Sequence, residues 1–235
     1  MKRGIGFFLV IVLVTFSCSE VEQVPPDMGF DYFPLQAGNY SLYQVEEVTG
    51  LGSAVTQVSY EIRATVTDST INEKGEVTYF MVREKRTGSS GNWENLDTWS
   101  AKVINGRVIQ NEGNVLYVKL IFPPSLNLTW DGNEYNNLPD NGQLFYDGYD
   151  VPYVISEIDK PISLKTGFES DRTLTVTQND FNDFTVGTDE RKEVYARGVG
   201  LVYKEINQVI KCTGSGCSGD RSFLFIQSLK EYGKI

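Results

Sequence analysis

Apolar and polar residues alternate along much of the chain, which is the pattern of half-buried β-strands. In residues 55–66 the even-numbered positions from 58 onward are apolar, and the positions between them are polar or charged. Residues 115–122 place Leu116, Val118, Leu120 and Phe122 on one face, and residues 173–178 alternate threonine with leucine and valine. This alternation predicts antiparallel strands that each pack one face on a core.

Residues 76–85 and 222–229 are apolar on both faces over part of their length, which favours strands in the centre of a sheet. Turns rich in Gly and Asn separate the strands, and Asn105-Gly106 is the strongest hairpin signal. We therefore expect an all-β fold of about ten strands with long loops. Its form would be a single antiparallel, strongly curved sheet, or a half-barrel or open barrel.

Two segments interrupt the alternation and are dense in Asn, Asp and Gly. They are residues 126–145 and 177–191. We expect both to be long loops or splayed hairpins, and loops of this length in a compact domain are often functional.

The N-terminus has a short apolar run, residues 5–14, after Lys2 and Arg3. About 20 apolar residues are needed to cross a bilayer, so this run is more typical of the h-region of a secretory signal peptide. The small residue Ser17 before Cys18 resembles a bacterial lipoprotein signal, in which the cysteine is acylated, palmitate included, and becomes the mature N-terminus. An uncleaved anchor and a plain signal peptide with a chance cysteine are the alternatives.

The predicted organisation is a signal peptide (1–17), an acidic, proline-containing tether (18–28) and a single β domain (29–235). Lipidated Cys18 would tether the protein to a membrane, because several acyl chains hold a protein stably at a bilayer. Glu20 and Glu22 resemble a signal of Bacteroidota for display on the outer face of the outer membrane. We expect a lipid anchor in the outer membrane, on its periplasmic or cell-surface face.

The charge of the chain excludes one class of partner. It has 21 basic and 31 acidic residues, and loss of Lys2 and Arg3 with the signal would leave 19 against 31, a net charge of −12. Nucleic-acid binding depends on Lys and Arg that neutralise phosphates, so we expect no nucleic-acid partner.

Cys212 and Cys217 are close together in a glycine-rich segment. Outside the cytoplasm such a pair predicts a disulfide. A metal site is not expected, because the chain has no histidine and no second cysteine pair.

The absence of histidine also excludes Ser-His-Asp and Cys-His catalysis and zinc proteases of the H-E-x-x-H type. A pair of carboxylates, as in glycosidases, stays open, but no acidic residue stands out in the sequence. We expect no catalytic residue and no cofactor.

Residues 126–145 and the tyrosines just after them hold the candidate binding side chains, Trp130, Asp131, Asn133, Tyr135 and Tyr146. The aromatic rings could stack on a sugar or grip a partner, and the oxygen groups could bind calcium. The alternatives are buried aromatic side chains and turn-forming Asn, Gly and Asp.

Three motifs resemble an uncharacterised family of Bacteroidota lipoproteins. They are DYFPLQAGNYSLYQVEE (31–47), WDGNEYNNL (130–138) and EVYARGVGLVYKEI (193–206). The resemblance implies a β-rich fold and an envelope location, and it implies no activity. The two glycines of RGVG (197–200) suggest a corner in the curved sheet.

We interpret the chain as a lipid-anchored envelope protein whose domain is non-enzymatic and binds or scaffolds another component. Its expected partners are the membrane, through Cys18, and another envelope protein or a glycan. The alternative is a β module that binds a glycan or a hydrophobic ligand in the cavity of its curved sheet. A deep pocket with aromatic walls would favour this alternative.

Overall fold

The computed structural model describes residues 26–88, 90–136, 151–214, 216 and 218–235. Within them the chain forms twelve strands and a short 3-10 helix: η1 (Phe30–Tyr32), β1 (Asn39–Leu51), β2 (Ala54–Ile71), β3 (Val77–Arg86), β4 (Glu94–Ile104), β5 (Arg107–Glu112), β6 (Val115–Ile121), β7 (Thr129–Trp130), β8 (Tyr153–Ser163), β9 (Glu169–Asp183), β10 (Gly187–Ala196), β11 (Gly200–Ile210) and β12 (Arg221–Lys234). The all-β prediction is confirmed, although the strands number twelve instead of about ten.

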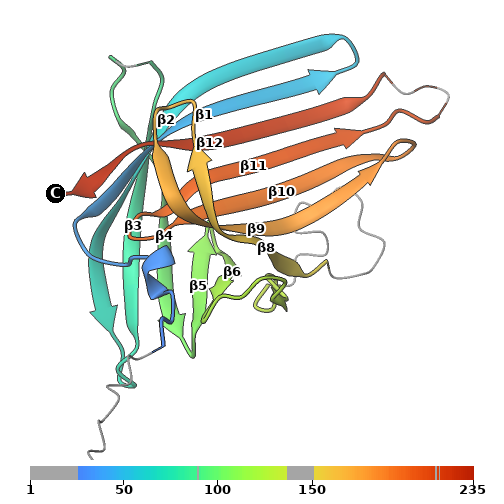
Figure 1. The fold of residues 1–235 in the computed structure, drawn as a ribbon. Helices are drawn as coiled ribbons and strands as arrows, with labels where there is room; N and C mark the ends of the chain where they lie inside the picture. The colour runs from blue at the N-terminus through green and yellow to red at the C-terminus, as the bar shows by residue number, and fades with distance from the viewer. Residues whose placement is uncertain (1–25, 89, 137–150, 215, 217) are drawn as a thin grey trace, which may run out of the picture.

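All twelve strands belong to one antiparallel sheet, in the order β6-β5-β4-β3-β2-β1-β12-β11-β10-β9-β8-β7. Strands that are consecutive in sequence pair, except β6 and β7, which are the two edges, and the first strand pairs with the last, which places β1 and β12 at the centre (Figure 1). The predicted central strand at residues 222–229 is therefore confirmed. The Asn105-Gly106 hairpin is also confirmed, with the positive φ angles of 50° and 74° that a tight turn needs.

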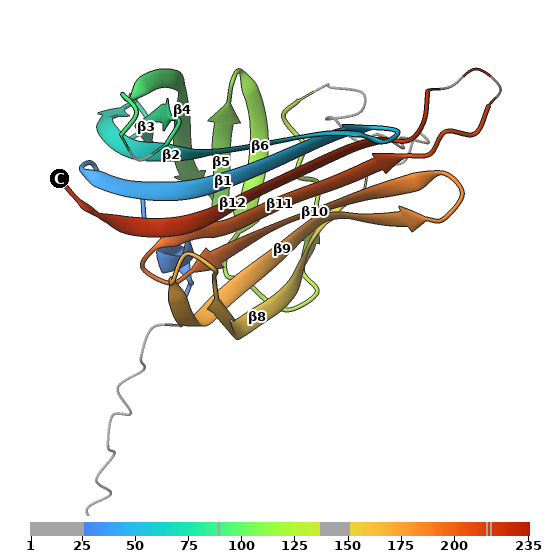
Figure 2. The same ribbon diagram turned by 90° about the horizontal axis from the view of Figure 1, so that it is seen from above.

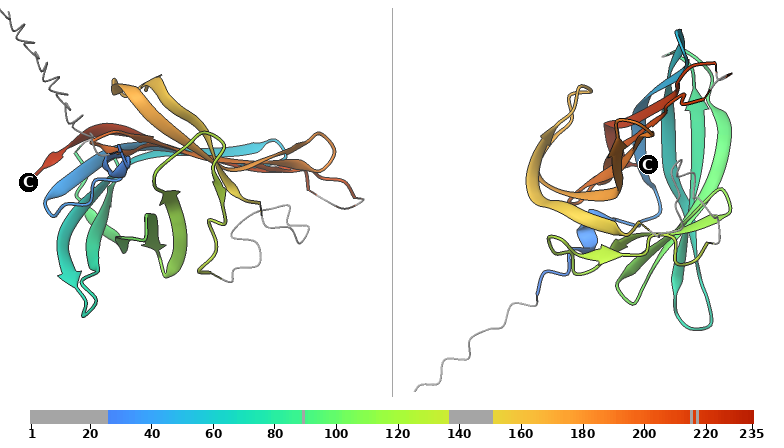
Figure 3. Two further views of the ribbon diagram at one scale, coloured as in Figure 1. Left: turned by 60° about the horizontal axis from the view of Figure 1, so that its bottom comes forward. Right: turned by 90° about the vertical axis from the view of Figure 1, so that its right-hand side faces the viewer.

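The sheet is strongly curved, so that β3–β6 stand opposite β8–β11 (Figures 2 and 3). The backbone N–H of Val118 in β6 donates to the carbonyl of Gly132, just after β7, at 2.9 Å. The indole Nε1 of Trp130 donates to the carbonyl of Val118 at 2.7 Å. These bonds connect the two ends of the sheet and nearly close it into a barrel.

The largest core lies on the concave face of the sheet. Its buried side chains come from β5, β6, β8, β9 and β10, and they include Val108, Val118, Leu120, Ile155, Leu174, Val176 and Tyr195. Tyr32 of η1 is fully buried among them. The segment before β1 therefore packs inside the curved sheet and belongs to its core.

A smaller core includes Val194, Ala196, Val202 and Leu229. Side chains from the end of the β8–β9 hairpin, Ile162, Leu164 and Phe168, pack against it. Val194 and Ala196 of β10 alternate along the strand with Glu193 and Tyr195, which face the interior. The β8–β9 hairpin thus covers part of the convex face.

Two local predictions are corrected by the structure. Residues 177–191 form the paired ends of β9 and β10, so the expectation of a long loop is wrong and the hairpin alternative is right. Gly198 lies in the turn between β10 and β11, where the chain reverses, and Gly200 is the first residue of β11. They therefore form a hairpin connection and not a corner within a continuous strand.

Residues 1–25 lie outside the described residues, so the predicted signal peptide, Cys18 and most of the tether stay predictions. In the part of the chain that the structure describes, no helix is long and apolar enough to cross a membrane.

Candidate functional site

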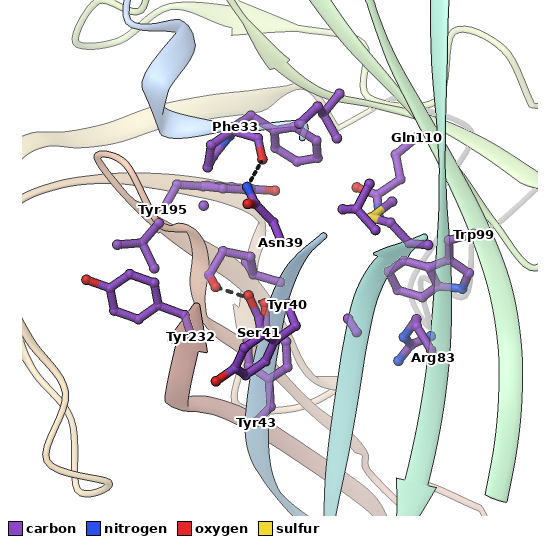
Figure 4. Close-up of a pocket in the computed structure, with 18 of the residues that line it drawn as sticks. Phe33, Asn39, Tyr40, Ser41, Tyr43, Arg83, Trp99, Gln110, Tyr195 and Tyr232 are labelled. Carbon is purple, nitrogen blue, oxygen red and sulfur yellow. Dashed lines mark hydrogen bonds between the residues drawn. The ribbon is translucent and has the colours of Figure 1, made fainter. Parts of the chain in front are cut away.

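A chamber of about 340 Å³ lies on the concave side of the sheet. It is lined by the segment before β1, by β1–β6, and by β10–β12 with the turn between β10 and β11. Its aromatic lining residues are Phe33, Tyr40, Tyr43, Trp99, Tyr195 and Tyr232 (Figure 4). Small-molecule sites usually measure about 300–1,000 Å³, so the chamber has room for a small ligand.

The chamber has a mouth and a floor that differ in chemistry. Tyr232, which is 50% exposed, and Lys234, which is also exposed, line the mouth. Phe33, Pro34 and Leu35 add apolar surface from the segment before β1. The floor consists of buried polar and charged side chains. A ligand would therefore enter past apolar and aromatic groups and the exposed Lys234, and would reach buried polar groups at the far end of the chamber.

One wall of the chamber carries a stacked pair of side chains, Arg83 and Trp99. The guanidinium of Arg83 lies 3.7 Å from the centre of the Trp99 ring, and its Nη1 contacts Asp97 Oδ2 at 2.9 Å. Such cation–π contacts hold an aromatic ring in place. One face of Trp99 is therefore covered by protein and does not serve as a stacking platform.

The floor contains four charged residues, Glu112, Lys119, Glu193 and Lys204, called here the ion cluster. Lys119 Nζ lies 2.6 Å from Glu193 Oε1 and 3.0 Å from Glu112 Oε1. Lys204 Nζ lies 3.2 Å from Glu193 Oε1 and 3.6 Å from Glu112 Oε2. The Tyr195 hydroxyl donates to Glu193 Oε2 at 2.6 Å. Each carboxylate therefore contacts both ammonium groups.

Local strand geometry explains how Lys119 reaches this position. The pairing of β5 with β6 shifts register between Val108 and Ile109, so Lys119 has no opposite residue on β5. Such a bulge re-aims a side chain. Lys119 points inward and is only 4% exposed, although both its neighbours, Val118 and Leu120, are also buried.

Burial and the opposite charges determine the ionisation of the cluster. Burial alone would raise the pKa of Glu193, but Lys119 and Lys204 outweigh it and hold that pKa at about 2. The same balance lowers the pKa of Glu112. Burial opposes the charge of Lys119, yet Glu112 and Glu193 raise its pKa well above the ordinary value. Both carboxylates and Lys119 are therefore charged at neutral pH.

Two glutamine side chains, Gln110 on β5 and Gln227 on β12, also line the buried part of the chamber. Each is 6% exposed. Among the residues that the structure describes, neither side-chain amide has a hydrogen-bond partner. Neither amide is among the fully enclosed polar atoms that lack a partner, and both residues line the chamber. These amides are consequently available to a ligand.

A second cavity of about 290 Å³ shares Glu112, Lys119 and Lys204 with the chamber. Its other lining groups are largely polar and include Gln178 and Arg191. The ion cluster therefore separates two cavities inside the curved sheet.

A clamp on the N-terminal segment lies close to the chamber mouth. Arg197, in the turn between β10 and β11, contacts Asp27 Oδ2 and Asp31 Oδ1, each at 2.8 Å. Its guanidinium also lies 4.6 Å from the centre of the Tyr32 ring. These contacts fix the segment that carries Phe33 into the chamber.

The predicted binding residues that the structure describes line no part of the chamber, although Asn133 lines the second cavity. Trp130 is 7% exposed, donates to Val118 and packs edge-on against Tyr153, so it is a core residue. Asp131 is exposed and accepts the backbone N–H of Asn133, as in an ordinary turn. Tyr135 is 45% exposed. Tyr146 lies outside the described residues.

The predicted disulfide and the possible calcium site both fall in segments that the structure describes only in part. Cys217 lies outside the described residues, so its pairing with Cys212 stays a prediction. Glu134, in the segment whose oxygen groups could bind calcium, pairs with Arg107. Within the described ranges no group of three or more Cys, Asp or Glu residues could hold a metal ion.

The sequence reasoning missed every residue of the ion cluster. One signal was present: Lys119 is the single charged residue in the otherwise apolar run 115–122. A lysine between buried positions of a strand is unusual. It could have indicated an interior charge that needs an acidic partner.

Comparisons with known proteins give similarity of fold alone. No protein-family model matches the sequence, and no curated protein matches it. Among solved structures, the chain is similar to a candidate exported protein with a YmcC-like fold from Bacteroides fragilis. The TM-score is 0.43 and the identity 12%, over 86% of this chain and 98% of the other. It is also similar to a candidate lipoprotein from Parabacteroides distasonis, with a TM-score of 0.39 and 15% identity over the same shares.

Proposed function

We propose that this protein is a non-enzymatic binding domain that holds a small hydrophobic or amphipathic molecule in the chamber. One observation carries the proposal: a ligand-sized cavity inside the sheet has apolar aromatic walls and unpaired buried amides at its floor. An aromatic-lined pocket favours the ligand-binding alternative from the sequence over a purely scaffolding role.

The proposal includes the cellular location predicted from the sequence. Acylation at Cys18 would hold the domain at the bacterial outer membrane, and the tether would leave the chamber free of the bilayer. Replacement of Cys18 by Ala, followed by cell fractionation, tests this part. A variant protein that still sediments with the membranes would contradict lipid anchoring.

The ionisation of the ion cluster supports a binding role over acid–base catalysis. A general acid for glycoside hydrolysis needs a carboxyl group whose pKa is raised. The pKa values of Glu112 and Glu193 are lowered by Lys119 and Lys204. Neither carboxyl group carries a proton at neutral pH.

The binding test uses N-phenyl-1-naphthylamine, an uncharged apolar probe whose fluorescence rises in an apolar site. We expect saturable binding by the purified protein. Ala64 lines the chamber, so Ala64→Phe should fill part of it and abolish binding. Ala54→Phe is the matched control, because Ala54 is exposed near the tip of the β1–β2 hairpin.

Overpacking of a buried position often costs about 1–3 kcal/mol, so circular dichroism should accompany each titration. If Ala64→Phe does not fold, Met81→Trp fills the chamber from β3 in its place. Equal probe binding by the wild type and a folded chamber-filling variant would refute the proposal.

A further inference from the structure

The floor of the chamber has no net charge, although it is rich in charges. The ion cluster holds two carboxylates and two ammonium groups, and each carboxylate contacts both ammonium groups within 2.6–3.6 Å. The other buried charge in the lining, Arg83, is paired with Asp97. A charged ligand group that reached this floor would lose its hydration without finding a free opposite charge.

The unpaired groups at the floor are neutral amides. Gln110 and Gln227 line the chamber from two strands that are not neighbours in the sheet, β5 and β12, and each is only 6% exposed. A primary amide offers donors and an acceptor. A ligand group that uses both the donors and the acceptors of the two glutamines must therefore accept and donate.

We infer that the chamber selects an amphipathic ligand with an uncharged head that both donates and accepts hydrogen bonds, such as an amide or a hydroxyl. The head lies at the floor between Gln110 and Gln227, and the apolar body lies toward the mouth beside Phe33 and Leu35. This inference rests on the proposed function, because it specifies the ligand of the same chamber.

The test compares three compounds that have the same chain length and differ in the charge of the head group. Octanamide, octanoate and octylamine displace N-phenyl-1-naphthylamine from the purified protein at pH 7, each below the concentration at which it self-associates. We expect octanamide to displace the probe at a concentration at least ten-fold lower than either charged compound. Ten-fold corresponds to about 1.4 kcal/mol, within the cost of burying an unmatched charge.

Two variants test the role of the amides. Gln110→Leu and Gln227→Leu should each weaken binding of octanamide by about five-fold, the value of one hydrogen bond, and reduce its advantage over octanoate and octylamine, with each displacement corrected for the affinity of that variant for the probe. Gln57→Leu is the matched control, because Gln57 is exposed on β2 and lines no part of the chamber. The wild-type comparison of the three heads stands even if a variant does not fold.

The outcomes separate this inference from the proposed function. Equal or stronger displacement by octanoate or octylamine overturns the inference, while probe binding leaves the proposed function standing. Displacement by free cellobiose at a lower concentration than octanamide also overturns it, in favour of a glycan. Absence of probe binding removes the proposed function, and the inference falls with it.

Discussion

Replacement of Lys119 by Met is the sharpest test of the ion cluster. The methionine side chain keeps the length of the lysine stem and removes its charge. Glu112 and Glu193 would then share the single ammonium group of Lys204 at 3.6 and 3.2 Å. The buried cluster would change from neutral to a net charge of −1.

The expected cost follows from the contacts that Lys119 makes. At an effective dielectric constant of about 20, two opposite charges about 3 Å apart attract by about 5–6 kcal/mol. Lys119 makes two such contacts, at 2.6 and 3.0 Å, and is 4% exposed. Relief of its own desolvation returns several kcal/mol, and removal of one partner from a buried ion pair usually costs about 3–5 kcal/mol. We expect Lys119→Met to lower the free energy of unfolding by this amount.

A second substitution should recover part of this loss. In the double variant Lys119→Met, Glu193→Gln the cluster is neutral again, because Glu112 and Lys204 remain as a pair. The double variant should cost about 2–3 kcal/mol less than the sum of the two single variants, the upper part of the range for residues in contact.

The assay is equilibrium urea denaturation followed by circular dichroism, with the free energy extrapolated linearly to water. Lys102→Met is the matched control, because Lys102 is partly exposed and contacts Glu76 at 3.8 Å. Such a pair is worth at most about 1 kcal/mol. A cost of Lys119→Met that does not exceed this control, or strict additivity in the double variant, would refute the reasoning.

Three other predictions concern pH, packing and the N-terminal clamp. The pKa of Glu193 falls from 4.5 to about 2 on folding, so its stabilisation of about 3 kcal/mol is present above pH 4.5 and is lost as pH falls toward 2, measurable by urea denaturation at each pH. Gly132→Ala should lower the melting temperature by several degrees, because the new Cβ would lie 2.3 Å from the Tyr153 ring. Arg197→Met should raise amide hydrogen exchange at residues 27–33, because the clamp on Asp27 and Asp31 is lost.

Each of these predictions has a control in the same chain. In the Glu193→Gln variant, the free energy of unfolding should fall less as the pH is lowered from 4.5 toward 2. A pH profile that matches the wild type would contradict the prediction for Glu193. Gly214→Ala should leave the melting temperature unchanged, because its Cβ would enter open space. Arg172→Met removes an exposed contact with Asp159. Equal exchange in the Arg172 and Arg197 variants would contradict the clamp.

Alternation of apolar and polar positions was sufficient to predict the class of fold. It identified strands such as β2 and β6, and the chemistry of Asn105-Gly106 located a hairpin. It could not identify the chamber, because Lys119 and Glu193 are 74 residues apart and meet only after the sheet has curled. The bulge at Lys119 also depends on the register of β5 against β6, which no local pattern specifies.

The choice between a loop and a hairpin for the polar segment 177–191 stayed open in the sequence for a different physical reason. Sequence patterns treat polar residues as exposed, but Gln178, Asn179 and Asp189 are buried on the strands of the β9–β10 hairpin. A strand whose inward face is polar looks like a loop in the sequence. Gln178 and Arg191 of this segment line the second cavity, so part of its polar inward face borders a cavity.

The pairing of β1 with β12 has a consequence for how the molecule is made. Asn39 at the start of β1 lies opposite Lys234 at the end of β12, so this seam joins residues almost 200 positions apart in the middle of the sheet. During synthesis β1 emerges long before its partner, and pairings between distant residues form late. In a sheet formed by the first six strands, β1 therefore remains an unpaired edge until β12 has been synthesised. Loss of only the last strand would divide the sheet at its centre.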